Sequence, residues 1–241
     1  MSAPPPVLDR AEVVRRLDRV RHRIAEAGGD PTTVSVVAVT KTFGPEVVRV
    51  ALASGLDQLG ESYAQELASK AADLDARPLP PAGGVVGAPA WHFIGGLQRN
   101  KVRRVAGLVS LWQSVDRAEV GLEIARRRPG AAVLVQVNTT GEGTKAGCAP
   151  GDASALVDQL GSAGLVVRGL MTVGPTDPTV DPRPSFAALR SLVDQLGLEV
   201  CSMGMSADLD SAIREGSTMV RLGTALFGPR AVRGAGDSSV A

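Results

Sequence analysis

The chain has 241 residues, a hydrophobic content of 44%, a charged content of 21% and a formal net charge of +1. These values are typical of a globular protein with a large core, and the balanced charge gives no electrostatic reason to expect nucleic acid or an anionic membrane as a partner. The two cysteines, Cys148 and Cys201, lack metal-ligand spacing, and we find no signal peptide or membrane span. We therefore expect a cytoplasmic protein without a metal site.

An amphipathic helix opens the predicted fold, because apolar residues recur at helical spacing between Asp9 and Gly28. After it, short apolar runs alternate with helical patterns. The runs predict strands at 34–40, 57–60, 90–95, 108–113, 132–138, 166–171, 198–202 and 218–222. The patterns between them predict helices at 45–54, 63–75, 98–105, 116–128, 152–162, 183–196 and 206–215.

Apolar strands separated by helices indicate a parallel sheet covered by helices. Eight such units in a chain of this length predict an α/β protein, a single (β/α)8 TIM-type barrel with an extra N-terminal helix, and one domain over 1–241. A doubly wound open sheet is the alternative. The segment 77–89, rich in Pro and Gly, predicts an inserted loop, and we expect residues 1–6 and about 231–241 to be disordered.

Lys41 directly follows the first predicted strand, where functional side chains lie in this barrel class. Arg221 lies in the eighth strand, which is the neighbour of the first in a closed barrel. A desolvated lysine can lose its proton and form an imine with an aldehyde, which arginine cannot do. An ordinary lysine at a strand end is the alternative.

Glycine and hydroxyl residues follow the seventh and eighth predicted strands. Gly223 and Thr224 suit an anion-binding turn, Ser202 and Gly204 end the seventh strand, and Ser206 can cap the next helix. Phosphate sites in these barrels often lie beside the last two strands. We therefore expect a phosphate group between the two turns, with ordinary turns as the alternative.

Seven segments, in order from about residue 34 to 230, resemble the pyridoxal-phosphate homeostasis protein family, whose barrel is of the alanine racemase type. They are VVAVTKTF, GESYAQE, WHFIGGLQRNK, VLVQVNTTGEGTKAG, RGLMTV, SMGMSADLDSAI and GSTMVRLGTALFG. The resemblance implies that Lys41 forms the Schiff base with pyridoxal 5′-phosphate (PLP) and that Arg221 contacts its pyridine nitrogen. It further implies a phosphate cup made by Ser202, Met203, Gly204, Gly223 and Thr224.

Three more residues are candidates for the cofactor site. Met171 would lie near the ring, although a methionine at a strand end is more often core. Ser62 stands where the family usually has Asn, and Gly96 where it usually has His. Ser62 would donate to the rim of the cofactor with shorter reach. For His92, a histidine hydrogen-bonded within the barrel is the alternative.

The resemblance implies a protein that holds PLP and acts in its homeostasis and supply without substantial catalysis, with apo-enzymes that use PLP as partners. The alternative is a PLP-dependent amino-acid racemase or lyase. Racemases of this fold carry a further β-domain and a tyrosine base opposite the lysine, whereas here the barrel takes up nearly all residues. The one tyrosine, Tyr63, starts a helix, which leaves His92, Lys145 and Cys148 as candidate second bases.

Two further features bear on function and assembly. A guanidinium at the pyridine nitrogen leaves that nitrogen unprotonated, which makes the ring a poorer electron sink and disfavours transamination. The aromatic content of 3% offers few anchors for a permanent interface, so we expect a monomer.

Overall fold

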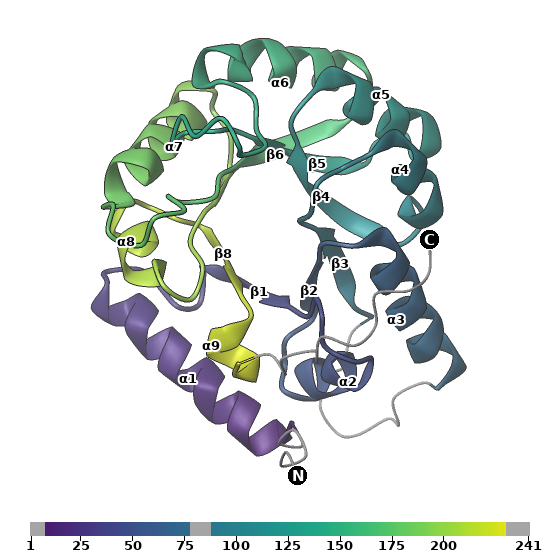
Figure 1. The fold of residues 1–241 in the computed structure, drawn as a ribbon, viewed down its shortest axis with the longest axis vertical. Helices are drawn as coiled ribbons and strands as arrows, with labels where there is room; N and C mark the ends of the chain where they lie inside the picture. Colours follow the sequence, from purple (N-terminus) through teal and green to yellow (C-terminus); the bar gives the residue numbers. More distant parts are fainter. Residues whose placement is uncertain (1–7, 78–87, 230–241) are drawn as a thin grey trace.

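The computed structural model describes residues 8–77 and 88–229. Within them, eight parallel strands pair in chain order, and β8 pairs with β1 in a register that sets Ser35 opposite Met219 (Figure 1). This pairing confirms the predicted closed barrel and excludes the open sheet. The strands are β1 (Ser35–Val39), β2 (Gln58–Glu61), β3 (Ala90–Phe93), β4 (Val109–Val115), β5 (Ala132–Gln136), β6 (Val166–Met171), β7 (Val200–Ser202) and β8 (Met219–Leu222).

The helices surround the barrel (Figure 1). They are α1 (Arg10–Glu26), α2 (Glu46–Ala53), α3 (Ala64–Ala76), α4 (Arg99–Val105), α5 (Ala118–Arg127), α6 (Ala153–Ser162), α7 (Arg183–Gln195), α8 (Leu209–Arg214) and α9 (Thr224–Phe227), with a 3-10 turn η1 (Pro150–Asp152). The sequence did not predict α9 or η1, because elements this short show no hydrophobic repeat.

The extra helix α1 begins where the sequence predicted. The side chain of Asp9 accepts a hydrogen bond from the backbone N–H of Ala11 at 3.2 Å and caps the helix. One face of α1 is buried, and Arg23 forms an ion pair with Asp210 of α8 at 3.0 Å. In Figure 1, α1 lies beside α8 and α9, across the outside of the β8–β1 closure.

The core has two parts, because side chains of a strand alternate between the two faces of the sheet. The larger part fills the space between the sheet and the helices. The smaller part lies inside the barrel and consists of Val37, Leu111, Leu134, Met171, Val200 and Met219. On β8, the side chain of Met219 belongs to the inner part and that of Val220 to the outer part. Because side chains alternate along a strand, the side chain of the next residue, Arg221, points into the barrel.

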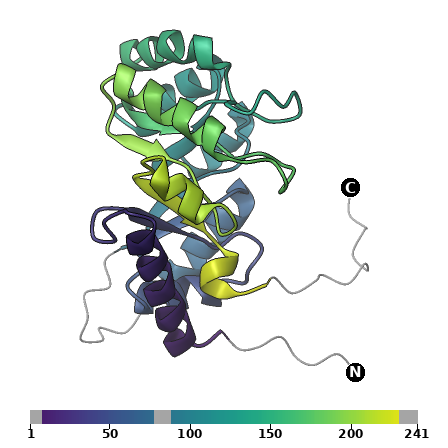
Figure 2. The same ribbon diagram turned by 90° about the vertical axis from the view of Figure 1, so that its left-hand side faces the viewer.

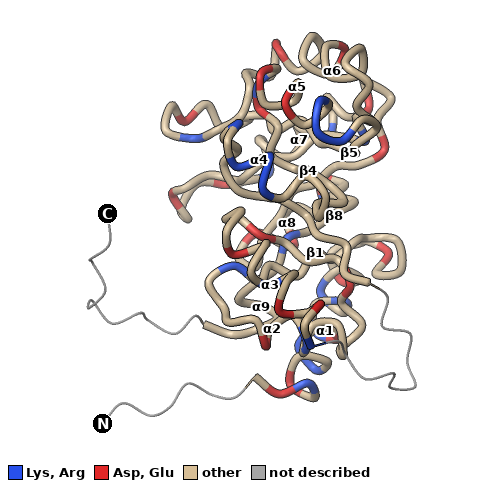
Figure 3. Tube along the Cα trace, turned by 90° about the vertical axis from the view of Figure 1, so that its right-hand side faces the viewer, with Lys and Arg blue, Asp and Glu red and all other residues tan. Residues whose placement is uncertain are grey.

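On the side shown in Figure 3, Lys and Arg are interspersed with Asp and Glu. The exposed cations of α4 form no ion pair with a described residue and are Arg99, Lys101, Arg103 and Arg104.

No described helix has the length and apolarity needed to cross a membrane. The expected disorder at 1–6 and 231–241 falls outside the described residues, as does 78–87 of the expected inserted loop.

Candidate functional site

Lys41 lies in a tight turn at the C-terminal end of β1. The backbone N–H of Phe43 donates to the carbonyl of Thr40 at 3.2 Å, so Lys41 and Thr42 are the central residues of a four-residue turn. Thr42 has a φ of 70°, a left-handed conformation that is rare for a β-branched residue. Lys41 itself is half-buried. The chain thus leaves the first strand through a strained turn centred on the predicted reactive lysine.

A buried ion pair lies behind this turn, on the outer face of the sheet. The Nζ atom of Lys70 on α3 lies 2.6 Å from Oε1 of Glu61 at the end of β2, and both residues are buried. Burial raises the pKa of Glu61, although Lys70 and the Thr40 hydroxyl oppose this effect. This pair could not be predicted from the sequence, because Lys70 falls in an ordinary amphipathic helix pattern.

Arg221 lies inside the barrel on β8 and is only 5% exposed. Its Nη1 atom donates to Ser202 Oγ and its Nη2 atom to the carbonyl oxygen of Thr172, both at 2.7 Å. Within the described residues it forms no ion pair with a carboxylate, and its Nε donates no hydrogen bond. Burial lowers the pKa of the guanidinium to about 10, which leaves it charged at neutral pH. A buried cation without an acidic partner is unusual in a protein core.

Gln113 on β4 extends these contacts across the barrel. Ser202 Oγ donates to Gln113 Oε1 at 2.8 Å, and Gln113 Nε2 lies 2.8 Å from Nδ1 of His92. Burial, with a smaller contribution from Arg168, lowers the pKa of His92 to about 4, so the ring is neutral and Nδ1 accepts. Four buried side chains from four strands thus form one directional chain of hydrogen bonds. Gln113 was not among the site residues predicted from the sequence.

His92 also lines a hollow of about 450 Å³ at the N-terminal ends of the strands. This is the end of the barrel opposite to the turn that holds Lys41. Of the two interpretations of His92, the hydrogen bond to Gln113 favours a histidine satisfied within the barrel. Its connection to Arg221 runs through Gln113 and Ser202.

The turns after β7 and β8 lie together at the C-terminal end of the barrel. Ser206 Oγ accepts a hydrogen bond from the backbone N–H of Ala225 at 3.1 Å and so ties the first turn to α9. The expectation that Ser206 caps the following helix is wrong, since α8 starts only after Asp208. The N–H groups of Ser206, Gly223 and Thr224 donate to no other described residue.

Glycines let these turns approach their neighbours. Gly204 has a φ of 95°, and a Cβ atom there would lie 2.5 Å from Cβ of Ala212. A Cβ atom on Gly223 would lie 3.3 Å from the carbonyl oxygen of Val39, at the end of β1. The rings of Phe43 and Phe227 also meet edge to face at 5.7 Å. The predicted phosphate turn therefore adjoins the turn that holds Lys41.

The remaining predicted residues, Met203, Met171 and Ser62, lie in three different places. Met203 is buried in the outer core layer, with its sulfur 3.6 Å from Cys201 Sγ, so its side chain packs under the helices. Met171 is buried in the inner core of the barrel. Ser62 is half-buried after β2, where its backbone meets the loop after β3 so closely that a Cβ on Gly95 would collide with it. Gly96 is exposed, with open space around it.

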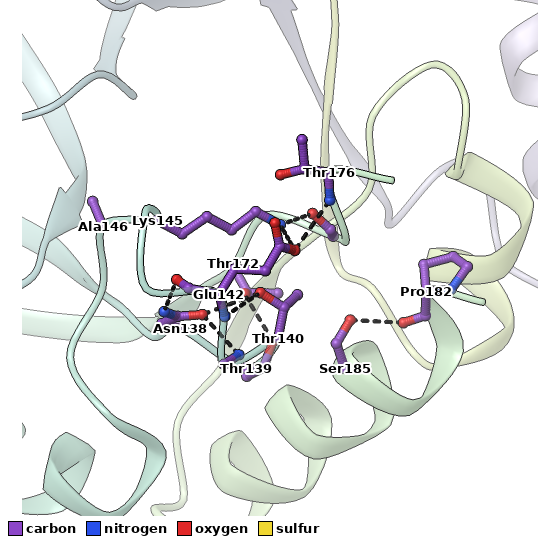
Figure 4. A network of polar contacts seen from close by, with 12 residues as sticks. Asn138, Thr139, Thr140, Glu142, Lys145, Ala146, Thr172, Thr176, Pro182 and Ser185 are labelled. Carbon is purple, nitrogen blue, oxygen red and sulfur yellow. Dashed lines mark hydrogen bonds and ion pairs between the residues drawn. The ribbon is translucent and has the colours of Figure 1, made fainter. Parts of the chain in front are cut away.

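The loops after β5 and β6 project from the same end of the barrel as α9 (Figure 2). Lys145 joins them, because its Nζ atom pairs with Glu142 Oε1 at 2.7 Å and donates to the carbonyl oxygen of Gly174 (Figure 4). Glu142 also accepts from the N–H of Thr176 at 3.1 Å. Lys145 and Thr176 hold the pKa of Glu142 at about 2. The ammonium group of Lys145 thus links the loop after β5 to the loop after β6.

The candidate base Cys148, and Tyr63, which the sequence analysis set aside, both lie in surroundings unlike those of an active base. Burial raises the pKa of the Cys148 thiol to about 11, so it is protonated at neutral pH. Tyr63 is 57% exposed at the start of α3. Both cysteines are free, and the described residues contain no cluster of His, Cys, Asp and Glu suited to a metal ion.

Comparison with known proteins places these features in a family. The family described as "Alanine racemase, N-terminal domain" matches residues 15–231. The pyridoxal phosphate homeostasis protein of Pseudomonas aeruginosa is 43% identical over 220 residues, which cover 88% of this chain and 91% of the relative. That of Aquifex aeolicus is 38% identical over 90% of this chain and 96% of its own.

Solved structures agree with this assignment. PipY of Synechococcus elongatus, in a structure with PLP bound, superposes with a TM-score of 0.76 at 30% identity, over 90% of this chain and all of its own. An alanine racemase of Clostridium difficile shares the fold at a TM-score of 0.66 and 14% identity, and the match covers 59% of that longer chain. The chain belongs to the pyridoxal phosphate homeostasis protein family.

Proposed function

We propose that this protein binds PLP through Lys41 and acts in PLP homeostasis, holding the cofactor and supplying it to apo-enzymes without substantial catalysis. The observation that carries the proposal is that Lys41 follows β1, the strand that pairs with β8, and that the buried Arg221 of β8 forms no ion pair with a described carboxylate. The relatives named for this role and the PLP-bound PipY structure support it.

The residues at this end of the barrel fit PLP in their chemistry. When bound, PLP supplies an aldehyde that a primary amine traps reversibly. Lys41 provides the amine, and Arg221 retains an Nε–H donor for the pyridine nitrogen. The unused N–H groups of Ser206, Gly223 and Thr224 suit a phosphate dianion, because a turn of backbone N–H groups forms an anion-binding concavity.

In this proposal, Ser202 orients the guanidinium group of Arg221. Its hydroxyl accepts from Arg221 and donates to Gln113, and it is fully buried, so it fixes the plane of the guanidinium beneath the phosphate cup. The resemblance also implies that Gly204 and the backbone of Met203 shape the cup, that Met171 lies near the ring, and that Ser62 and His92 are further candidates.

Two observations favour a carrier over a racemase or lyase. Lys145, a candidate second base, holds an ion pair with Glu142, and Cys148 is kept protonated by burial. Arg221 is a donor without acceptor capacity, so it leaves the pyridine nitrogen unprotonated and makes the ring a poorer electron sink than a carboxylate partner would.

Visible absorption spectroscopy tests this proposal. We expect PLP to give the wild-type protein a visible band that borohydride removes, and Lys41→Ala to lack that band while keeping weaker binding through the phosphate turn. Lys101→Met, at an exposed lysine of α4, is the matched control and should behave as wild type. Sustained racemisation or turnover of amino acids by the loaded protein would replace the carrier role with the enzymatic alternative.

A further inference from the structure

A cluster of buried charges contacts the backbone on both sides of Lys41. We define the Lys70 cluster as Glu61, Glu66 and Lys70. The ammonium group of Lys70 lies 2.6 Å from the carbonyl oxygen of Thr40, 2.6 Å from Glu61 Oε1 and 2.8 Å from Glu66 Oε1. An ammonium group has three N–H donors, and each has one acceptor here. All three N–H donors of Lys70 are therefore satisfied, and they hold these three oxygen atoms together.

The two glutamates complete the grip on the turn. Glu61 Oε1 accepts from the hydroxyl of Thr40 at 2.6 Å, and Glu66 Oε1 accepts from the backbone N–H of Thr42 at 2.6 Å. The cluster thus binds the residue before Lys41 and the residue after it. These contacts come from β2 and α3, on the outer face of the sheet.

The turn needs such support because its backbone is strained. Thr42 is the single non-glycine residue with a positive φ within 8–77 and 88–229. A β-branched residue in this conformation persists only where its surroundings hold it, and such residues gather at functional sites. The hydrogen bond from the Thr42 N–H to Glu66 is the contact that holds it here.

Stability alone does not explain the cluster. Burying two charges costs about as much as their mutual attraction returns, and apolar residues of similar size often serve a core equally well. Glu61 is completely buried, and its Oε2 atom has no hydrogen-bond partner among the described residues. A cluster that contributes little net stability but fixes two backbone groups is suited to setting a geometry.

We propose that Lys70, with Glu61 and Glu66, is a positioning residue that fixes the Thr40–Phe43 turn and thereby the direction and reactivity of the Lys41 amine. This inference rests on the proposed function for the use of that amine. The cluster contacts the residues on both sides of Lys41, so it acts through Thr40 and Thr42.

Competitive trace labelling of lysines with acetic anhydride, read by mass spectrometry across a pH series, tests the positioning without any cofactor. We expect Lys70→Met to change the labelling rate of Lys41 by about threefold to tenfold, the factor that corresponds to one lost hydrogen bond. Lys101 and Lys145 in the same sample should label as in wild type. An unchanged pH profile of Lys41 in the folded Lys70→Met protein would overturn the proposal.

Glu66→Ala provides a second test in case Lys70→Met does not fold, because Glu66 lies at the half-buried end of the cluster. It removes the acceptor of the Thr42 N–H and should change Lys41 labelling in the same sense. Glu119→Ala, at the exposed first turn of α5, is the matched control and should leave Lys41 unchanged. Equal Lys41 labelling in Glu66→Ala and Glu119→Ala would refute the positioning role.

A second arm adds PLP and follows the borohydride-trapped adduct. We expect Lys70→Met and Glu66→Ala to need several-fold more PLP for half-maximal adduct on Lys41, while Glu119→Ala matches wild type. If wild type forms no adduct, the proposed function fails, and the labelling arm still decides whether the cluster positions Lys41. An adduct that forms equally well in all variants would contradict the positioning role alone.

Discussion

The buried, neutral His92 is expected to make the fold sensitive to mild acid. Its pKa lies at about 4 in the folded protein against the ordinary value of 6.5, because the ring is buried and, to a smaller extent, because Arg168 lies near it. The unfolded chain therefore binds more protons between these two values, and the free energy of unfolding falls as the pH falls through this range. The full loss is about 3 kcal/mol, of which about 2 kcal/mol falls between pH 7 and pH 5.

Denaturant unfolding at the two pH values, followed by the fluorescence of the buried tryptophans Trp91 and Trp112, measures this loss. His92→Gln keeps an oxygen that can accept from Gln113 but cannot titrate, so its stability should fall by about 2 kcal/mol less than that of wild type. His22 is exposed, and His22→Gln is the matched control that should lose as much as wild type. Parallel losses in wild type and His92→Gln would refute the account of His92.

Two substitutions, with a third as a control, test the loops at the C-terminal end of the barrel. Gly204→Ala should lower the free energy of unfolding by at least about 1 kcal/mol, because the positive φ and the contact with Ala212 both disfavour a Cβ. Gly96→Ala, in open space, should stay within about 0.5 kcal/mol of wild type, and similar thermal shifts in both would contradict this reasoning. Lys145→Met should cost about 1 to 2 kcal/mol, since it removes the ion pair and the hydrogen bond that join two loops. A denaturation midpoint unchanged by Lys145→Met would show that these contacts add nothing.

The barrel could be predicted because each of its strands is a short apolar run between helical patterns. The pairing of β8 with β1, the strand that Lys41 follows, could be predicted from closure alone, since the first and last strands of a barrel are neighbours. The internal chain from Arg221 to His92 could not be predicted in the same way. Its members come from four strands, and their contacts exist only after the barrel has closed.

The same reason explains what the sequence analysis missed around Lys41. Lys70 lies in a helix pattern with other polar residues, and nothing local distinguishes a buried lysine from an exposed one. Its carboxylate partner Glu61 stands at the end of a strand that faces α3 only in the folded protein. Ser206 was assigned to the wrong helix because its acceptor role depends on α9, which is too short to show a pattern.

Peptide mapping of the trapped adduct tests the central claim most directly. Protein incubated with PLP is reduced with borohydride and digested, and the modified lysine is identified by mass spectrometry. We expect the adduct on the peptide that contains Lys41, at one equivalent per chain, with Lys70, Lys101 and Lys145 unmodified. An adduct spread over several lysines, or one that persists undiminished in Lys41→Ala, would contradict the claim that Lys41 holds the cofactor.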